Sequence, residues 1–413
     1  MVPIHAPTLV TTSSAERGML LALNAGSWSL KFALYSLADV SASRWRGKIE
    51  GLGGADATLI FQGDQADARR VPLGRIDHLQ ALREVIERCA EAMTTDAELI
   101  SIGHRVVHGG PHLNGPVLID REVIDRLRAM EPYDPAHQAI ELGCIEAITA
   151  RWPDLPQVTC FDTTFHRNLP EVAQRLPVPR LDAARGLRRY GFHGLSYTHV
   201  MDELRRTAGE AAATGRLILA HLGDGASLAA VRGGRCLDTT MGFTPTGGIP
   251  MSNRSGDLDP GVFLWLARNH KMSAEEIFEQ MTRRSGLLAV SETTSDLRDL
   301  LERAGDDLRA TDAIEMFCYY VRKAIGALAA VLGGIDTLVF TGGIGEHQPE
   351  IRERVCRELA FLGIALDQAS NVENAAVLSR DGAKVTVRVI AADEERIIAR
   401  GVRHVLQARR LGT

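Results

Sequence analysis

Two segments of the chain share one pattern of apolar and polar positions. In residues 20–35, four apolar residues lead into a short polar turn, and alternating apolar positions follow it. Residues 217–231 repeat this plan around a glycine-rich turn. The pattern predicts two antiparallel hairpins. Because the same unit occurs twice in a chain of 413 residues, it indicates two related domains, each with one polar turn.

The first polar turn carries short hydrogen-bond donors and a cation. Asn24, Ser27 and Ser29 supply an amide and two hydroxyl groups, and Lys31 follows them. Such donors, with exposed backbone N–H groups beside a glycine, favour a bound phosphate group. A purely structural turn is the open alternative for this hairpin taken alone.

The periodicity of the remaining chain predicts alternating helices and strands. Helices are expected over 76–89, in two pieces within 119–150, from near Tyr197, and over 260–269, 273–284 and 311–332. Antiparallel strands are expected within 46–71, and further strands beginning at 99, 157, 337 and 385. The strand that begins at 337 is expected to run into a glycine turn. Residues 238–260 are too rich in glycine and proline for regular structure, and a long loop of this kind is usually functional.

Charged residues stand at the ends of several predicted elements. Arg105 and Asp162 each follow a buried strand, where ligands of α/β sheets usually bind. Asp162 suits Mg²⁺ bound through water, or it caps the next turn. His193 stands between glycines that let a ligand approach the backbone closely. Glu394, at the start of the last helix, suits either a metal or the helix dipole.

Composition and charge narrow the functional classes. A net charge of −5, with both signs mixed along the chain, argues against nucleic acid or an anionic membrane surface as a partner. The six cysteines form no Cys-x-x-Cys pair, which fits reduced thiols and a cytoplasmic protein. No apolar run approaches the length of a bilayer span. Residues 1–18 are expected to be a short flexible lead-in.

A series of motifs from Leu20 onward resembles the acetokinase family, the acetate, propionate and butyrate kinases. The motifs, in the family's order, are Asn24-Ala-Gly-Ser-Trp-Ser-Leu-Lys, Gly103-His-Arg-Val-Val-His-Gly-Gly, Phe161-Asp-Thr, Arg189-Tyr-Gly-Phe-His-Gly, His221-Leu-Gly-Asp-Gly, Met251-Ser-Asn-Arg-Ser-Gly-Asp, Thr341-Gly-Gly-Ile-Gly-Glu and Asp393-Glu-Glu.

The resemblance implies a fold and a reaction. The fold class is α/β, with two ribonuclease H-like domains, as in actin, sugar kinases and heat-shock chaperones, and an active site in the interdomain cleft. The expected domains are 19–165 plus 396–413, and 166–395. The implied reaction is that of an acetate kinase: direct, reversible in-line transfer of the ATP γ-phosphoryl group to acetate or another short-chain carboxylate, with Mg²⁺ or Mn²⁺. A homodimer is also implied.

The matching positions imply roles for individual residues. The catalytic residues would be Arg105, Asp162, His193 and Arg254. The carboxylate substrate would contact Arg105, Val107, Ala136, His137, Phe192 and Pro245. ATP would contact Asn24, Ser27, Ser29, Lys31, His221, Gly223, Asp224, Gly225, Asp296, Leu297, Arg298, Gly343, Ile344, Gly345 and His347. The metal would be held by Asn24, Asp162 and Glu394.

Four positions depart from the family pattern. Trp28 replaces a serine, and Asp224 and His347 each replace an asparagine. Asp224 places an extra negative charge beside the triphosphate, which predicts weaker nucleotide binding. Ala136 replaces a leucine of the acyl pocket. Each buried methylene contributes about 0.8 kcal/mol, so the freed space favours propionate or butyrate relative to acetate.

Several alternatives stay open at this point. The chain could be a propionate or butyrate kinase with an enlarged pocket, or a degenerate paralogue that binds nucleotide and catalyses weakly. A nucleotide-gated binding protein would have no use for the cationic cluster of Arg105, Arg254 and His193. A sugar kinase would use Asp162 as a general base towards a hydroxyl group.

Overall fold

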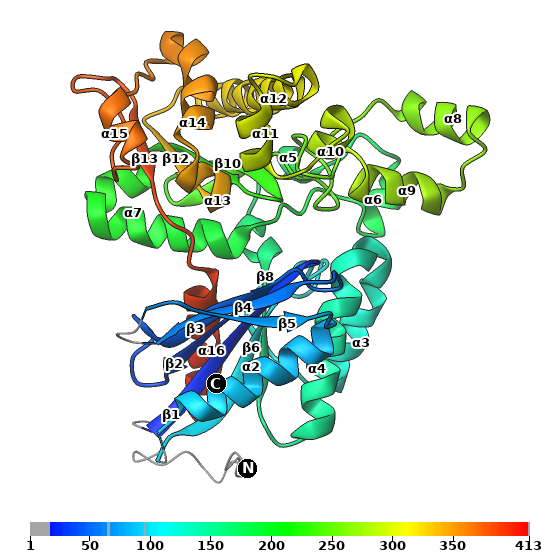
Figure 1. Ribbon diagram of the computed structural model, residues 1–413, viewed down its shortest axis with the longest axis vertical. Coiled ribbons are helices and arrows are strands. Elements are labelled where there is room, and N and C mark those ends of the chain that lie inside the picture. Colours follow the sequence, from blue (N-terminus) through cyan, green and yellow to red (C-terminus); the bar gives the residue numbers. More distant parts are fainter. Residues whose placement is uncertain (1–16, 64–66, 95, 412–413) are drawn as a thin grey trace. The chain divides into compact units, whose positions relative to one another are not determined.

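The computed structural model describes residues 17–63, 67–94 and 96–411, without the side chains of Pro132, Pro135, Ala136 and Arg410. It divides into two compact units (Figure 1). The first holds the described residues up to Thr164, then Gly194–His199 and the chain from Asp393 onward. The second holds Phe165–His193 and Val200–Ala392. The expected domain boundaries stay a prediction, and most of the expected lead-in lies outside the described residues.

The first unit contains, among its described residues, an eight-stranded sheet in the order β5-β4-β3-β2-β1-β6-β8-β7. Its strands are β1 (Gly18–Ala25), β2 (Ser29–Ser36), β3 (Ser43–Glu50), β4 (Ala57–Gly63), β5 (Arg69–Gly74), β6 (Glu98–Val106), β7 (Val117–Leu118) and β8 (Gln157–Phe161). Its helices are α2 (His78–Ala92), α3 (Arg121–Ala129), α4 (Pro135–Arg151) and α16 (Glu394–Leu411). The predicted hairpin is confirmed as β1 and β2, and β1 also pairs in parallel with β6.

The apolar run at the start of β1 is explained by burial on both faces of the sheet. Leu21 and Leu23 pack in a cluster with side chains of α2 and α4. Leu20 and Ala22 point to the opposite face, where they pack with residues of α16. Since successive side chains of a strand alternate between faces, a strand covered on both sides is apolar at every position.

The second unit contains, within the described part of the chain, a five-stranded sheet in the order β11-β10-β9-β12-β13. Its strands are β9 (Arg216–Leu222), β10 (Ala226–Arg232), β11 (Arg235–Thr239), β12 (Thr337–Thr341) and β13 (Thr386–Val389). Its helices are α5 (Glu171–Gln174), α6 (Arg180–Ala184), most of α7 (Gly194–Thr214), α8 (Pro260–Asn269), α9 (Ala274–Arg283), α10 (Gly286–Ser291), α11 (Leu297–Arg303), α12 (Leu308–Leu332), α13 (Gly342–His347), α14 (Pro349–Cys356) and α15 (Gln368–Val372). The second predicted hairpin is confirmed as β9 and β10.

Two local predictions need correction. The helix expected from near Tyr197 begins earlier, at Gly194, because His193 adopts a left-handed conformation and forms the N-cap. The glycine turn expected after β12 is instead the short helix α13. The prediction of an irregular segment is confirmed, since no helix or strand lies between Thr239 and Pro260 in this described stretch.

The described chain offers neither a membrane-crossing helix nor a disulfide bond. No helix among the described residues is both long enough and apolar enough to span a bilayer. All six cysteines are buried free thiols.

A carboxyl group is buried in the first unit beside the end of β6. Glu141 of α4 is only 2% exposed. The backbone N–H of Val107, which follows β6, donates to both Glu141 oxygens at 3.2 Å. Burial raises the pKa of Glu141 well above its ordinary value, and the charge of Arg105 opposes this shift only in part. The fold therefore fixes Val107, two residues after Arg105, with a carboxyl group that favours its protonated form.

Replacing Glu141 with glutamine should stabilise the protein increasingly as the pH rises. Because the folded state binds the Glu141 proton more tightly than the unfolded chain, wild-type stability falls as the pH rises above the ordinary pKa of a glutamate and through the raised pKa of Glu141. Glutamine removes this loss while still accepting from Val107. We expect the melting temperature of Glu141→Gln to rise relative to wild type across this range. Glu146→Gln, on the exposed side of α4, is the control, and parallel curves for Glu141→Gln and wild type would contradict the prediction.

Candidate functional site

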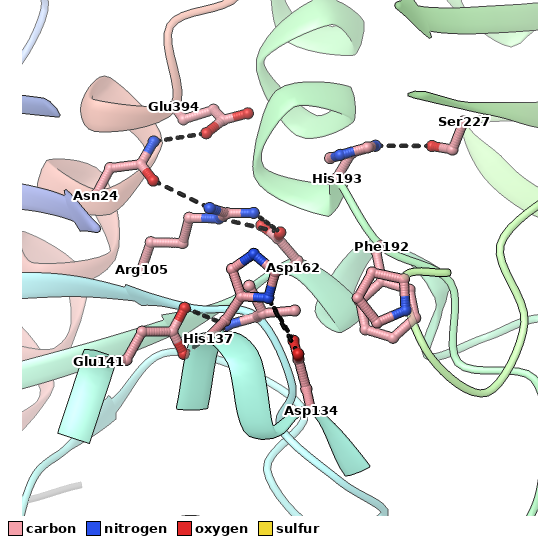
Figure 2. A network of polar contacts seen from close by, with 12 residues as sticks. Asn24, Arg105, Asp134, His137, Glu141, Asp162, Phe192, His193, Ser227 and Glu394 are labelled. Atoms are coloured by element: carbon pink, nitrogen blue, oxygen red, sulfur yellow. Dashed lines mark hydrogen bonds and ion pairs between the residues drawn. The ribbon is translucent and has the colours of Figure 1, made fainter. Parts of the chain in front are cut away.

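Arg105 and Asp162 form a buried ion pair at neighbouring strand ends of the first unit (Figure 2). Arg105 Nε and Nη2 donate to Asp162 Oδ2 at 3.0 and 2.6 Å, and Nη1 donates to Asn24 Oδ1 at 3.2 Å. The pairing follows from the parallel register, in which Arg105 of β6 lies opposite Cys160 of β8. The strand-end positions that the sequence indicated therefore meet.

The electrostatics of this pair keep the arginine cationic. Burial by itself would lower the pKa of Arg105, but the carboxylates of Asp162 and Glu394 outweigh burial and raise it. Burial raises the pKa of Asp162, and Arg105 counteracts that effect. A fixed cation next to two carboxyl groups suits a site where a metal and an anionic ligand meet.

The predicted metal-binding residues fit a Mg²⁺ ion held through water. Asn24 Nδ2 donates to Glu394 Oε2 at 2.7 Å (Figure 2). It also donates to Glu395 Oε1 at 3.1 Å, so the three side chains lie together. Asp162 Oδ1 is buried and has no hydrogen-bond partner in the described structure. No group of three or more His, Cys, Asp or Glu residues able to hold a metal directly occurs in the described part of the chain. Carboxylate and amide oxygens are typical ligands of Mg²⁺, which keeps several of its waters.

The first polar turn is connected to α4 by a chain of hydrogen bonds. Ser27 Oγ lies 3.1 Å from His137 Nε2, and His137 Nδ1 lies 3.0 Å from both carboxylate oxygens of Asp134. Because an ionised carboxylate only accepts, Nδ1 carries the proton, and Nε2 of a neutral ring accepts from the Ser27 hydroxyl. Asp134 was not among the predicted site residues, although it lies only three positions before His137.

The other predicted residues of the first unit lie nearby in the sheet. Lys31 lies in β2 directly across from Asn24, and Ser29 is the first residue of that strand. Val107 is buried next to Glu141. Trp28, one of the departures from the family, is 62% exposed and so does not fill the turn. The Ala136 side chain lies outside the described part of the structure.

A second set of predicted residues gathers in the second unit around Gly225. His193 has a φ angle of 58°, its Nδ1 lies 2.9 Å from Ser227 Oγ, and its ring stacks on His221 with centroids 4.2 Å apart. A Cβ atom placed on Gly225 would lie 3.1 Å from His193 Nε2 and 3.6 Å from Arg254 Nη1. The imidazole and the guanidinium therefore approach the same glycine.

Two residues that were predicted to contact the carboxylate substrate, Phe192 and Pro245, also belong to the second unit. Arg254 Nη1 donates to the backbone oxygen of Pro245 at 3.0 Å. Phe192 is buried, and its backbone oxygen lies 2.9 Å from His166 Nε2. These contacts fix Pro245 and Phe192 beside the two predicted catalytic groups of this unit.

The predicted nucleotide residues of the second unit lie around the turn of the second hairpin, on the short helix α13 and at the start of α11. A Cβ atom on Gly223 would lie 3.9 Å from the backbone nitrogen of Gly343, which brings the turn of the second hairpin close to α13. Asp224, on that turn, is exposed. Gly345 is buried, Ile344 is half-buried, and His347 is 73% exposed on its side chain.

At the start of α11, the polar residues predicted to contact ATP already form hydrogen bonds with each other. Asp296 is the N-cap of α11, and its carboxylate accepts from the backbone and the guanidinium of Arg298. Leu297 is buried. An adenosine at this position would therefore meet the Asp296–Arg298 pair and the backbone rather than a free carboxylate.

The predicted catalytic residues divide between the two units. Arg105 and Asp162 belong to the first, and His193 and Arg254 to the second. Besides Asp134, sequence reasoning missed Ser227, the hydrogen-bond partner of His193. Ser227 faces His221 across the hairpin in the β9–β10 register, so its place beside the turn was the available signal.

Comparisons with known proteins agree with these motifs. The family model of the acetokinase family matches residues 19–400. Acetate kinase of Rhodopseudomonas palustris (strain ATCC BAA-98 / CGA009) is 44% identical, over 93% of this chain and 97% of the relative. Acetate kinase of Methylocella silvestris is 42% identical, over 92% and 96%.

Solved structures give the same assignment. The crystal structure of Porphyromonas gingivalis acetate kinase has a TM-score of 0.82 at 35% identity and covers 94% of this chain and 100% of that one. A propionate kinase from Francisella tularensis has a TM-score of 0.85 at 31% identity, with 93% and 98% coverage. The two-sheet α/β architecture, the motifs and these matches together establish that the chain belongs to the acetokinase family.

Proposed function

We propose that this protein is an acyl kinase, an acetate kinase that transfers the γ-phosphoryl group of ATP reversibly to acetate and forms acetyl phosphate and ADP. The observation that carries the proposal is the buried Arg105–Asp162 pair with Asn24 and Glu394 beside it. In a member of the acetokinase family, this group combines a fixed cation for an anionic substrate with oxygen ligands for the metal that accompanies ATP.

The residues of both units support transfer without a general base. A carboxylate nucleophile is already ionised, so catalysis depends on positioning and on stabilising charge that spreads over the phosphoryl oxygens. Arg105 and Arg254 would orient the carboxylate and the phosphoryl group. His193 would donate to the phosphoryl group in transit through Nε2, because Nδ1 is directed to Ser227.

The metal and nucleotide contacts complete the proposal. Mg²⁺, or Mn²⁺ in its place, would neutralise phosphate charge, and Asp162, Glu394 and Asn24 would hold it, through water for the two carboxylates. Ser27, Ser29 and Lys31 would contact the phosphates, with Ser29 and Lys31 as donors. The adenosine would lie against α13 and the start of α11. A homodimer and a cytoplasmic location are further parts of this proposal, and light scattering of the purified protein tests the first.

Acid-dependent formation of an acyl phosphate tests the proposed reaction. The protein is incubated with Mg-ATP and hydroxylamine, which traps acyl phosphates, in the presence of acetate, propionate, butyrate or no acid. We expect product only when both an acid and Mg²⁺ are present, with acetate accepted. Bound ATP without product in any acid would contradict the proposal and favour a degenerate or nucleotide-gated protein.

The chain length of the preferred acid should depend on Ala136. Leucine at this position would add three carbons to the predicted pocket wall, so Ala136→Leu should lower the propionate to acetate ratio of kcat/KM by several-fold, at about 0.8 kcal/mol per methylene. Steady-state rates with both acids measure this ratio. Val172→Leu, at an exposed apolar position, is the control. An unchanged ratio in Ala136→Leu would show that Ala136 does not form the pocket wall.

The affinity for ATP should increase when the charge of Asp224 is removed. Asp224 is exposed on the turn beside Gly223, and its Oδ1 accepts from Ser252 Oγ at 3.5 Å. Asparagine keeps the acceptor and removes repulsion of the triphosphate. We expect Asp224→Asn to lower the KM for ATP about two- to fivefold, with a larger effect at low ionic strength. An equal or higher KM would count against a phosphate-facing role for this turn.

A further inference from the structure

The side chain of Glu346 joins two segments of the second unit that the chain separates widely. Its Oε1 accepts from the backbone N–H of Gly342 at 2.8 Å and from that of Ala392 at 2.9 Å. The side chain is 13% exposed. Gly342 begins α13, and Ala392 is the last residue of the second unit before the chain continues to Asp393. One carboxylate oxygen thus holds both segments.

The other side of α13 is held by a buried arginine. Arg352 of α14 is fully buried, and its Nη1 donates to the backbone oxygens of Gly345 and Glu346 at 2.9 and 3.0 Å. Its remaining donors bind Asn371 and Asn374. Burial lowers the pKa of Arg352 to about 10, so it stays cationic near neutral pH. Arg352 fixes the C-terminal end of α13. A displacement of the first turn of α13 is therefore transmitted to Ala392 through the Glu346 side chain.

The position of Ala392 gives this contact a functional meaning. Two residues later the chain reaches Glu394, whose carboxylate accepts from Asn24. Hydrogen bonds with an ionised acceptor are about twice as strong as neutral ones, and one oxygen serving two N–H groups fixes their separation. A ligand on α13 that shifts Gly342 therefore acts on Ala392 directly and on Glu394 through two covalent links.

We propose that Glu346 is a positioning residue that couples nucleotide binding at α13 to the placement of Glu394, and hence to metal binding. The inference rests on the proposed function for the identity of the nucleotide and metal sites. It assigns a role to a residue that touches neither substrate nor metal. Its consequence is that loss of Glu346 should impair nucleotide and Mg²⁺ together and leave the carboxylate substrate unaffected.

Two variants at Glu346 test the first part. Glu346→Ala removes the acceptor, whereas Glu346→Gln keeps an oxygen for both N–H groups and loses only the charge. We expect calorimetry with ADP, without metal, to give a Kd about tenfold higher for Glu346→Ala and within about threefold of wild type for Glu346→Gln. Glu350→Ala, an exposed glutamate on α14, is the matched control. Equal ADP affinity in Glu346→Ala and wild type would overturn the proposal.

A backbone variant separates coupling from simple support of α13. Ala392→Pro removes the N–H of Ala392 and leaves the contact with Gly342. We expect Ala392→Pro to leave the Kd for metal-free ADP unchanged and the KM for acetate within about twofold of wild type. The Mg²⁺ concentration that gives the half-maximal rate should rise about threefold or more in Ala392→Pro, and by a similar factor in Glu346→Ala. Unchanged Mg²⁺ dependence in both variants would reduce Glu346 to structural support and overturn the coupling.

The readouts separate this inference from the proposed function. If wild type forms no acyl phosphate with any acid, the proposed function fails, and calorimetric titration of Mg²⁺ in the presence of ADP takes the place of the rate measurement. If wild type is active and Glu346→Ala matches it in ADP affinity and Mg²⁺ dependence, only the coupling fails. Circular dichroism melting of each variant confirms that it is folded, and the Mg²⁺ dependence of Ala392→Pro decides the outcome if Glu346→Ala is not.

Discussion

The candidate site of the first unit is arranged around the ion pair between Arg105 and Asp162. Burying two charges costs more than their attraction returns unless further polar groups satisfy them, so a pair of this kind is weak evidence for stability. Asn24 satisfies one donor of the guanidinium, but Asp162 Oδ1 is left without a partner in the described structure. An incompletely satisfied buried carboxylate at a strand end is better explained by a ligand than by packing. Parallel pairing of β6 with β8 is what brings these two ends together.

Much of this arrangement could be predicted from the sequence, because it follows from local patterns. The double-sided burial of β1 produces a continuous apolar run, and β9 and β10 are buried, mostly apolar strands on either side of a glycine turn, so both hairpins were visible in the sequence. Arg105 and Asp162 stand at strand ends, which in α/β sheets lie at the same edge. The long helix α12 shows its buried face as a repeating apolar stripe. In each case a short-range period carries the information.

The contacts that sequence reasoning missed join residues far apart in the chain. His137 contacts Ser27 across 110 positions, and Glu346 contacts Ala392 across 46. No local period specifies such pairs, because they depend on how β1, α4 and β13 are placed by the cores. The helical form of α13 was missed for a related reason: three glycines favour a loop locally, but the Glu346 side chain accepts from the N–H of Gly342 within α13, and Arg352 of α14 binds the backbone oxygen of Gly345.

The conformation of His193 shows how the second unit prepares its part of the reaction. A non-glycine residue in the left-handed region costs on the order of 1–3 kcal/mol, and persists only where its surroundings hold it. Ser227 binds Nδ1, His221 stacks on the ring, and Gly225 leaves room for Nε2. Strain of this kind is unnecessary for a helix N-cap, which a serine or aspartate would form without it. The left-handed conformation of His193 has a purpose if the imidazole must be fixed before a phosphoryl group binds. A preorganised donor needs no rearrangement when negative charge develops on the phosphoryl oxygens. A reaction whose nucleophile is already ionised leaves this fixed placement of donors and cations as the main contribution of the protein.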